Sequence, residues 1–131
     1  MNVDEINVLV LAYLGDTIYE NYVRKFLICS GIANVNDLQK EAVNYVSAKA
    51  QCNYVTEMMN DNFFSEDELS VIKRARNNRN TSHPKNCDVI TYKYATGLEA
   101  LIGYLSLSDN NSRIDEIMNY ILRWLDVSIW S

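Results

Sequence analysis

The sequence predicts an all-α protein, built as one domain of bundled helices. Its 131 residues include only one proline and four glycines, which are too few turn-forming residues for a sheet of many short strands. Apolar residues instead recur at helical spacing between capping signals. With 48% hydrophobic residues, residues 1–131 can bury about two thirds of their unfolded surface. They therefore need no disulfide or metal ion merely to fold.

The first two helices are bounded by recognisable capping residues. The first predicted helix runs from about Asp4 to Cys29 and stops before Gly31, because glycine readily adopts the left-handed conformation that follows a helix. The second begins near Asn36. Ser47 can cap a separate helix after it, since a serine hydroxyl accepts a bond from a backbone amide of the first turn.

The later helices surround the only clear loop. Ser65 followed three residues later by Glu68 forms a capping box and predicts a helix that continues to about Arg79. Residues 80–87 contain the single proline and predict a loop. A long helix over residues 88–107 follows, then a turn at residues 108–111. The last predicted helix runs over residues 112–126.

The charge distribution qualifies the overall acidity. A net charge of −5 argues against a nucleic-acid partner, since phosphate binding usually requires a basic surface. Six cations nevertheless gather between residues 73 and 93, opposed only by Asp88, and we call this stretch the basic segment. They are Lys73, Arg74, Arg76, Arg79, Lys85 and Lys93. Such a segment on an acidic body can bind a polyanion, weakly and with strong salt dependence.

The cysteines and the N-terminus predict a cytoplasmic protein. Cys29, Cys52 and Cys87 are far apart and form neither a C-x-x-C pair nor a cluster with the only histidine, His83. A reducing compartment is therefore expected. The N-terminus lacks the basic start of a secretory signal. No apolar stretch reaches the ~20 residues that span a bilayer, so no membrane association is expected.

Two predicted helices are apolar nearly all round, yet each carries one acid. The stretch INVLVLAYLGDTIY at residues 6–19 contains only Asp16, and YATGLEALIGYLSLS at residues 94–108 contains only Glu99. A helix of this kind is normally buried. A buried carboxylate costs several kcal/mol unless it is paired, hydrogen-bonded, protonated or bound to a metal ion. Each acid therefore requires a partner.

Two explanations account for these acids. If the carboxylates converge, they form an oxygen-rich site suited to Mg²⁺, with Mn²⁺ as a second candidate, and Glu20 one turn beyond Asp16 can hold an outer-shell water. Three glycines favour a close helix approach there: Gly15, Gly97 and Gly103. Alternatively, the acids satisfy a backbone amide or a tyrosine hydroxyl in the core, and the glycines only allow the helices to cross.

A family resemblance distinguishes the two explanations. LAYLGDTIYE at residues 11–20 resembles the signature helix of the ribonuclease III catalytic domain, in which Gly-Asp supplies a metal-binding aspartate. TGLEALIGYL at residues 96–105 resembles the second acidic helix of that family, in which the glutamate before alanine is catalytic. Further matching stretches are NDL at 36–38, VSAK at 46–49, KRARN at 73–77, PKNCDV at 84–89 and TY at 91–92. Together they are most similar to the Mini-ribonuclease III branch, which lacks a double-stranded-RNA-binding domain.

Two positions depart from the wider family pattern. Ala12 stands where a glutamate is expected one turn before Asp16, and Thr96 stands where an aspartate is expected three residues before Glu99. Mini-ribonuclease III resembles this chain in both reductions. We therefore expect a metal site with fewer ligands rather than an inactive one.

The resemblance implies a metal-dependent endoribonuclease that cleaves double-stranded RNA and leaves 5′-phosphate and 3′-hydroxyl ends. Asp16 and Glu99 would be the catalytic residues and the ligands of Mg²⁺ or Mn²⁺. A homodimer would cut both strands, one per protomer, and the implied substrate is the base-paired ends of precursor 23S ribosomal RNA. The alternative is a ribonuclease III fold that has lost catalysis and acts as an RNA-binding or scaffold protein. A helical interaction protein without RNA would leave the lone acids unexplained.

The basic segment supplies the candidate RNA contacts. A-form RNA is recognised mainly by its shape, phosphates and 2′-hydroxyls, which suits arginine, lysine and asparagine. The candidates are Arg74, Arg76, Asn77, Arg79, Lys85 and Asn86. The alternative explanation is a solvated helix end whose cations favour the negative end of the helix dipole.

Overall fold

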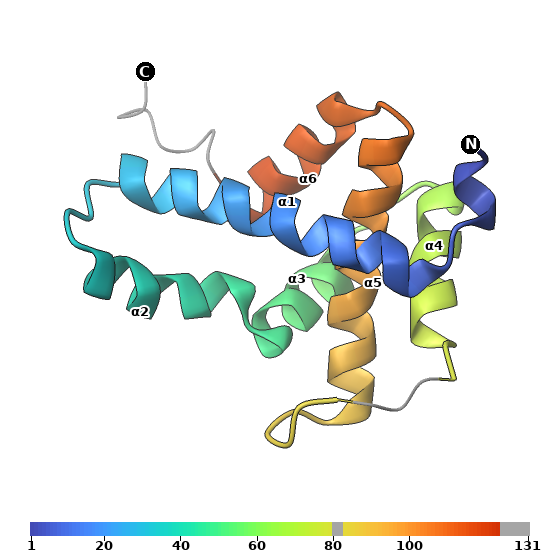
Figure 1. Ribbon diagram of the computed structural model, residues 1–131, viewed down its shortest axis with the longest axis horizontal. Helices are drawn as coiled ribbons and strands as arrows, with labels where there is room; N and C mark the ends of the chain where they lie inside the picture. The colour runs from blue at the N-terminus through green and yellow to red at the C-terminus, as the bar shows by residue number, and fades with distance from the viewer. Residues whose placement is uncertain (80–82, 124–131) are drawn as a thin grey trace.

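The computed structural model describes residues 1–79 and 83–123 of the protein (Figure 1). Over these residues it contains one short 3₁₀ turn and six α-helices without a β-strand, which confirms the predicted all-α class. The elements are η1 (Val3–Glu5), α1 (Val8–Cys29), α2 (Val35–Val46), α3 (Ala48–Asn60), α4 (Glu66–Arg76), α5 (Val89–Leu107) and α6 (Asn111–Leu122).

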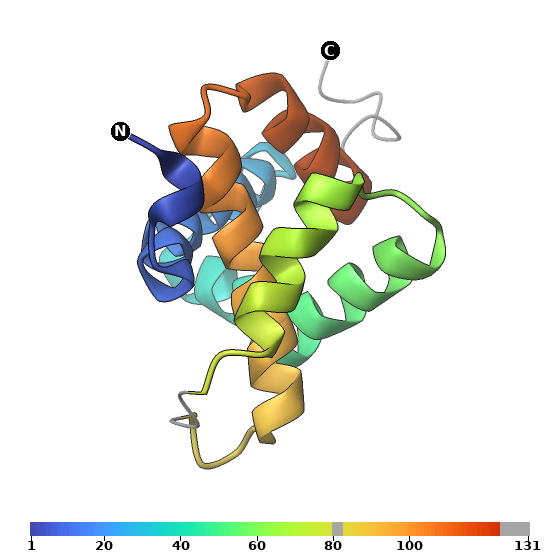
Figure 2. The ribbon, with the colours of Figure 1, turned by 90° about the vertical axis from the view of Figure 1, so that its right-hand side faces the viewer.

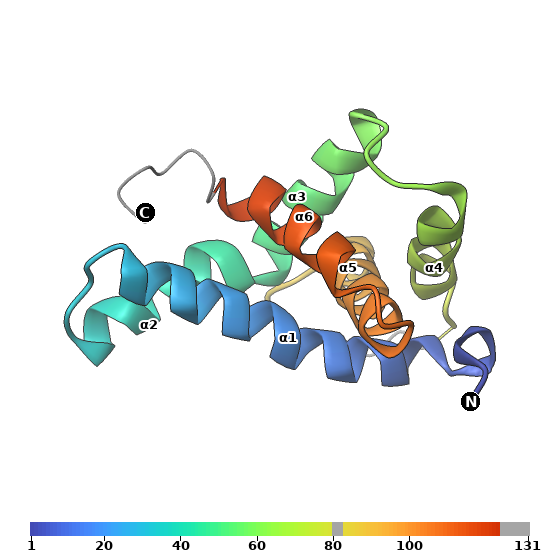
Figure 3. The same ribbon diagram turned by 90° about the horizontal axis from the view of Figure 1, so that it is seen from above.

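Helices α1 and α5 cross at the centre of the protein with their backbones in contact. The two helices run in clearly different directions in Figure 1, where α1 passes in front of α5, and α5 is seen almost end-on in Figure 3. A Cβ atom on Gly15 would lie 1.7 Å from the Glu99 carbonyl oxygen. One on Gly103 would lie 2.0 Å from the carbonyl oxygen of Leu11. The expected close approach is confirmed for Gly15 and Gly103, whereas Gly97 packs against Ile72 of α4. The crossing brings Asp16 next to Glu99.

The hydrophobic core surrounds α5. This helix packs against α1, α3, α4 and α6, so its side chains are buried on nearly every face, as the apolar sequence predicts. Leu98, Leu101 and Ile102 are fully buried, as are Tyr19 of α1 and Met118 of α6. Along the described chain, none of the helices combines the length and apolar character that a membrane span needs.

Most of the predicted helix boundaries are confirmed. The Ser47 hydroxyl accepts a hydrogen bond from the Ala50 amide at 3.2 Å, so α2 and α3 are separate helices. Gly31 has a φ of +93°, the left-handed conformation expected after α1. The capping box of Ser65 and Glu68 is present at the start of α4.

Three helix ends differ from the prediction. Helix α1 begins at Val8 rather than near Asp4, because the Asn7 side chain accepts a bond from the Leu9 amide at 2.8 Å and caps the helix there. Helix α4 ends at Arg76 rather than Arg79. The Asn78 carbonyl, just beyond this end, accepts a bond from the Lys93 ammonium instead of continuing the helix. Helix α6 ends at Leu122, and the predicted end at residue 126 lies outside the described residues.

An ion pair fixes the start of α4, the helix that carries the first cations of the basic segment. Glu68 is 6% exposed, and its carboxylate lies 2.8 Å from the Arg113 guanidinium of α6. Arg113 also donates to the Phe63 carbonyl at 2.7 Å and stacks over the Phe63 ring. Burial alone would raise the pKa of Glu68, but bonds from Arg113 and Ser65 lower it. The pair therefore stays charged and holds α4 against α6.

Candidate active site

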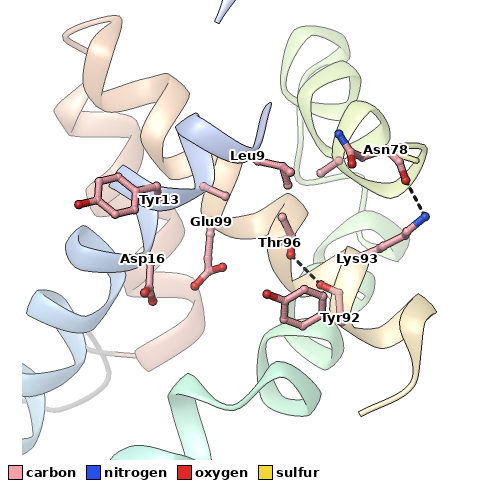
Figure 4. Close-up of a pocket in the computed structure, with 10 residues that line it drawn as sticks. Leu9, Tyr13, Asp16, Asn78, Tyr92, Lys93, Thr96 and Glu99 are labelled. Carbon is pink, nitrogen blue, oxygen red and sulfur yellow. Dashed lines mark hydrogen bonds between the residues drawn. The ribbon is translucent and has the colours of Figure 1, made fainter. Parts of the chain in front are cut away.

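A cleft of about 340 Å³ opens beside the crossing of α1 and α5 (Figure 4). It is lined by Leu9, Ala12, Tyr13 and Asp16 of α1, by Ala75 of α4 and Asn78 after it, and by Tyr92, Lys93, Thr96 and Glu99 of α5. Both acids singled out in the sequence thus line the same cleft, at the same end of it. Their carboxyl groups lie side by side in Figure 4.

The two acids differ in their surroundings. Asp16 is exposed and Glu99 is partly buried. Burial raises the pKa of Glu99 to about 8, together with Asp16, which accepts a hydrogen bond from protonated Glu99 and repels its charged form. Glu20 also raises this pKa. The site thus holds two carboxyl groups so close together that ionising both is unfavourable unless a cation joins them.

Neither acid has a basic partner in the part of the chain that the structure describes. The ion pairs there involve other acids, among them Glu20, which lies 3.5 Å from Arg24. The buried Tyr19 donates its hydroxyl to the Tyr45 carbonyl at 2.6 Å rather than to either carboxyl group. The alternative in which the acids satisfy a tyrosine or a backbone amide therefore finds no such bond among the described residues.

The donor set suits a hard divalent cation, but it is sparse. Across residues 1–79 and 83–123, no three histidine, cysteine, aspartate or glutamate side chains gather into a metal-binding group. Ala12 and Thr96, the two positions at which the family resemblance predicted acids, both line the cleft. The Thr96 hydroxyl donates to the Tyr92 carbonyl of its own helix at 2.9 Å. An ion between Asp16 and Glu99 would take its remaining ligands from water and phosphate, as Mg²⁺ commonly does.

Gln51 is a site residue that the sequence reasoning missed. It lies on α3, is 3% exposed, and lowers the pKa of Glu99, so its amide is near that carboxyl. Its Nε2 atom nevertheless lacks a partner at ordinary hydrogen-bond geometry in the described structure. A signal was available, because Gln51 shares the buried face of α3 with Val55 and Met58 at helical spacing. A polar residue on an apolar face requires a partner.

The candidate RNA contacts fall into two groups. Arg74 donates to the Ile6 carbonyl at 2.8 Å, and Arg76 donates to the Tyr94 hydroxyl at 3.4 Å, so both guanidinium groups also bind within the protein. The other four are exposed: Asn77, Arg79, Lys85 and Asn86. Residues 83–88, drawn in yellow in Figure 2, project beyond the ends of α4 and α5. Of the six candidates, only this second group is exposed.

Comparison with known proteins agrees with this fold. The family model described as the ribonuclease III domain matches residues 9–110. Proteins named Mini-ribonuclease 3 are similar over most of their length. The one from Brevibacillus brevis is 50% identical over 86% of this chain and 82% of its own. The one from Enterococcus faecalis is 41% identical over 91% of this chain and 90% of its own.

A solved structure shows the same fold. The crystal structure of a protein from Fusobacterium nucleatum superposes with a TM-score of 0.80 at 34% identity, covering 91% of this chain and 93% of that one. The chain therefore belongs to the ribonuclease III family, within its Mini-ribonuclease 3 branch. It is an endoribonuclease that cleaves double-stranded RNA, in a family that generally depends on divalent metal ions.

Proposed function

We propose that the cleft beside the α1–α5 crossing is the active site, with Asp16 and Glu99 as the catalytic residues and the ligands of Mg²⁺, or of Mn²⁺ as the second candidate. One observation carries this proposal: two carboxyl groups from two central helices meet without a basic partner among the described residues. Two like charges this close together are costly unless a cation compensates them.

The two acids are held differently in the proposed active site. Glu99 is fixed by the buried helix α5, whereas Asp16 faces solvent at the mouth of the cleft, where RNA arrives. A bound divalent ion lowers the pKa of a water and offsets negative charge on the phosphate. Hydrolysis joins the water oxygen to phosphorus and breaks the bond to the 3′ oxygen. The water loses a proton and the 3′ oxygen gains one, which leaves 5′-phosphate and 3′-hydroxyl ends.

Glu20 is proposed to hold a water molecule of the metal ion. It lies one turn after Asp16 on α1 and is close enough to raise the pKa of Glu99. The Glu20 carboxylate forms an ion pair with the Arg24 guanidinium at 3.5 Å. Both side chains are exposed to solvent, so this ion pair is weak. Glu20 therefore keeps an oxygen available for an outer-shell water.

Metal binding provides a direct test of the proposed site. Mg²⁺ or Mn²⁺ should raise the Tm of the protein, because a ligand that binds only the folded state stabilises it. The Tm of Glu99→Gln should rise much less, while Glu41→Gln, an exposed change on α2, should respond like the wild type. Differential scanning fluorimetry with EDTA, Mg²⁺ and Mn²⁺ measures this. An equal metal-induced shift in all three proteins would place the ion elsewhere.

The exposed end of the basic segment is proposed to contact the RNA backbone. Arg79 and Lys85 are exposed and carry charges that phosphates can pair with. Arg74, Arg76, Asn77 and Asn86 are proposed as further contacts. The substrate class proposed from the family resemblance is precursor 23S ribosomal RNA, cut within its base-paired ends. We further propose a cytoplasmic location, in keeping with the free cysteines.

Replacing Arg79 and Lys85 with glutamine should weaken duplex binding and flatten its salt dependence. Each lost phosphate contact reduces the slope of log K against log salt by about one, so the double variant should lose about two. Fluorescence anisotropy in EDTA at several salt concentrations measures the slope. Lys25→Gln with Lys40→Gln changes the net charge equally on other exposed surfaces and should leave the slope unchanged. Identical slopes for both double variants would remove the basic segment from the interface.

A homodimer is proposed through the exposed apolar face of α1. Val10 is 57% exposed and Tyr13 is 83% exposed, which is unusual for large apolar side chains on a central helix. Tyr13 also lines the cleft, so a two-fold copy docked on this face would bring two active sites together, as cutting both strands requires.

Val10→Asp with Tyr13→Asp should convert the dimer into a monomer, because buried unpaired carboxylates oppose association. Light scattering at micromolar concentration measures the mass. Val43→Asp, an equally exposed apolar position on α2 at 57%, should remain dimeric. A monomeric wild type with full activity would exclude the dimer mechanism.

A further inference from the structure

The proposed active-site cleft has a basic end as well as an acidic one. Lys93 lies on α5 six residues before Glu99 and lines the same cleft. In Figure 4 it extends to the wall opposite Asp16, where its ammonium group donates to the Asn78 carbonyl at 2.6 Å. Of the described residues that line the cleft, Lys93 is the one cation, facing the two acids Asp16 and Glu99.

The charge of Lys93 is not neutralised by the protein as described. It is half-buried, and the ion pairs of the described residues do not include it. A carbonyl accepts one of its three N–H groups but does not cancel its charge. A neutral donor could make that bond at a lower desolvation cost. The charge itself therefore favours an anionic ligand in the cleft.

Two uncharged residues of the cleft strengthen this conclusion. Ala12 and Thr96 line the same cleft and carry no charge. Carboxylates at these two positions would draw Lys93 into ion pairs and oppose the entry of a phosphate. In their absence, the cleft presents a carboxylate pair at one end and an uncompensated ammonium group at the other. A bound metal ion and an RNA phosphate match this arrangement.

We propose that Lys93 binds a non-bridging oxygen of the scissile phosphate and is a catalytic residue, a role that rests on the proposed active site. As the water oxygen bonds to phosphorus and the bond to the 3′ oxygen breaks, negative charge accumulates on the non-bridging oxygens. A cation already positioned in a partly dehydrated cleft stabilises that charge. Lys93 thereby supplies positive charge on the side of the phosphate away from Asp16 and Glu99.

The competing explanation is that Lys93 only ties the segment after α4 to α5 through Asn78. Lys93→Gln separates the two, because glutamine retains an N–H donor for the carbonyl but loses the charge. We expect kcat for duplex cleavage to fall about 100-fold, while KM and the Tm change little. Lys93→Arg should retain most of the activity. Lys40→Gln, the same change at an exposed lysine of α2, should behave like the wild type.

Chemical rescue provides a readout that a structural role would not move. Ethylammonium should raise the kcat of Lys93→Ala above its value in sodium chloride of equal ionic strength, and ethanol should not. Wild-type kcat in Lys93→Gln, alongside an inactive Asp16→Asn, would overturn the role of Lys93 but keep the active site. A loss of kcat that follows a lower Tm and resists rescue would show that Lys93 is structural. An active Asp16→Asn would overturn the proposed site itself.

Discussion

Asp16→Asn and Glu99→Gln are each expected to lower the kcat for cleavage of duplex RNA by at least about a thousandfold. Each change preserves the shape of the side chain and removes its negative charge. The two carboxyl groups meet in one cleft without a basic partner among the described residues. The remaining acid would hold a divalent cation too weakly for catalysis. Single-turnover cleavage in Mg²⁺ measures the loss.

Stability and RNA binding distinguish this catalytic role from a structural one. Because the pKa of Glu99 is raised to about 8, ionisation of Glu99 opposes folding. The metal-free protein should therefore lose stability as pH rises from the unfolded pKa of glutamate towards 8. Glutamine does not ionise, so Glu99→Gln should show less of this loss and a Tm in EDTA at pH 8 no lower than the wild type. Duplex binding in EDTA should change little.

Three other outcomes would each have a clear meaning. Equal unfolding of both variants would assign the acids to the core rather than to catalysis. Full activity in either variant would remove that residue from the reaction. A wild type that binds duplex RNA but does not cut it in Mg²⁺ or Mn²⁺ would favour the alternative of an inactive RNA-binding protein.

The acidic end of the site could be predicted because it violates a local rule. A single carboxylate in an otherwise apolar helix is visible in the sequence, and both Asp16 and Glu99 satisfy that description. Their meeting depends on the crossing of α1 and α5, which the small residues Gly15 and Gly103 also indicate. Local sequence therefore identified both acids, and the family resemblance favoured a metal site over a role in the core.

The rest of the site depends on contacts between distant segments. Gln51 becomes a neighbour of Glu99 only through the packing of α3 on α5. Lys93 was grouped with the basic segment, yet it lines the cleft and binds the Asn78 carbonyl 15 positions earlier. Arg74 likewise appeared to be a surface cation, whereas its guanidinium binds the Ile6 carbonyl. Helical periodicity does not specify which side chain meets which backbone carbonyl across the fold.

Gly103→Ala is expected to lower the free energy of unfolding by more than about 3 kcal/mol, although alanine favours helices. The added Cβ atom would lie 2.0 Å from the Leu11 carbonyl oxygen and 2.8 Å from its carbonyl carbon. These are backbone atoms of the first turn of α1, so no side-chain rotation can relieve the contact. The two central helices must separate, which also exposes core side chains such as Leu101. Urea denaturation followed by circular dichroism measures the change.

Gly97→Ala provides the matched control on the same helix. Its added Cβ atom would meet the Cγ2 atom of Ile72 at 3.2 Å and the Ile72 carbonyl oxygen at 3.3 Å, contacts that shifts of a few tenths of an ångström relieve. The helix propensity of alanine, about 1 kcal/mol better than glycine, offsets this strain, so stability should change by less than about 1 kcal/mol. A stable Gly103→Ala protein would show that α1 and α5 do not cross with their backbones in contact. The contact between Asp16 and Glu99 would then lose its structural basis, because the same crossing brings them together.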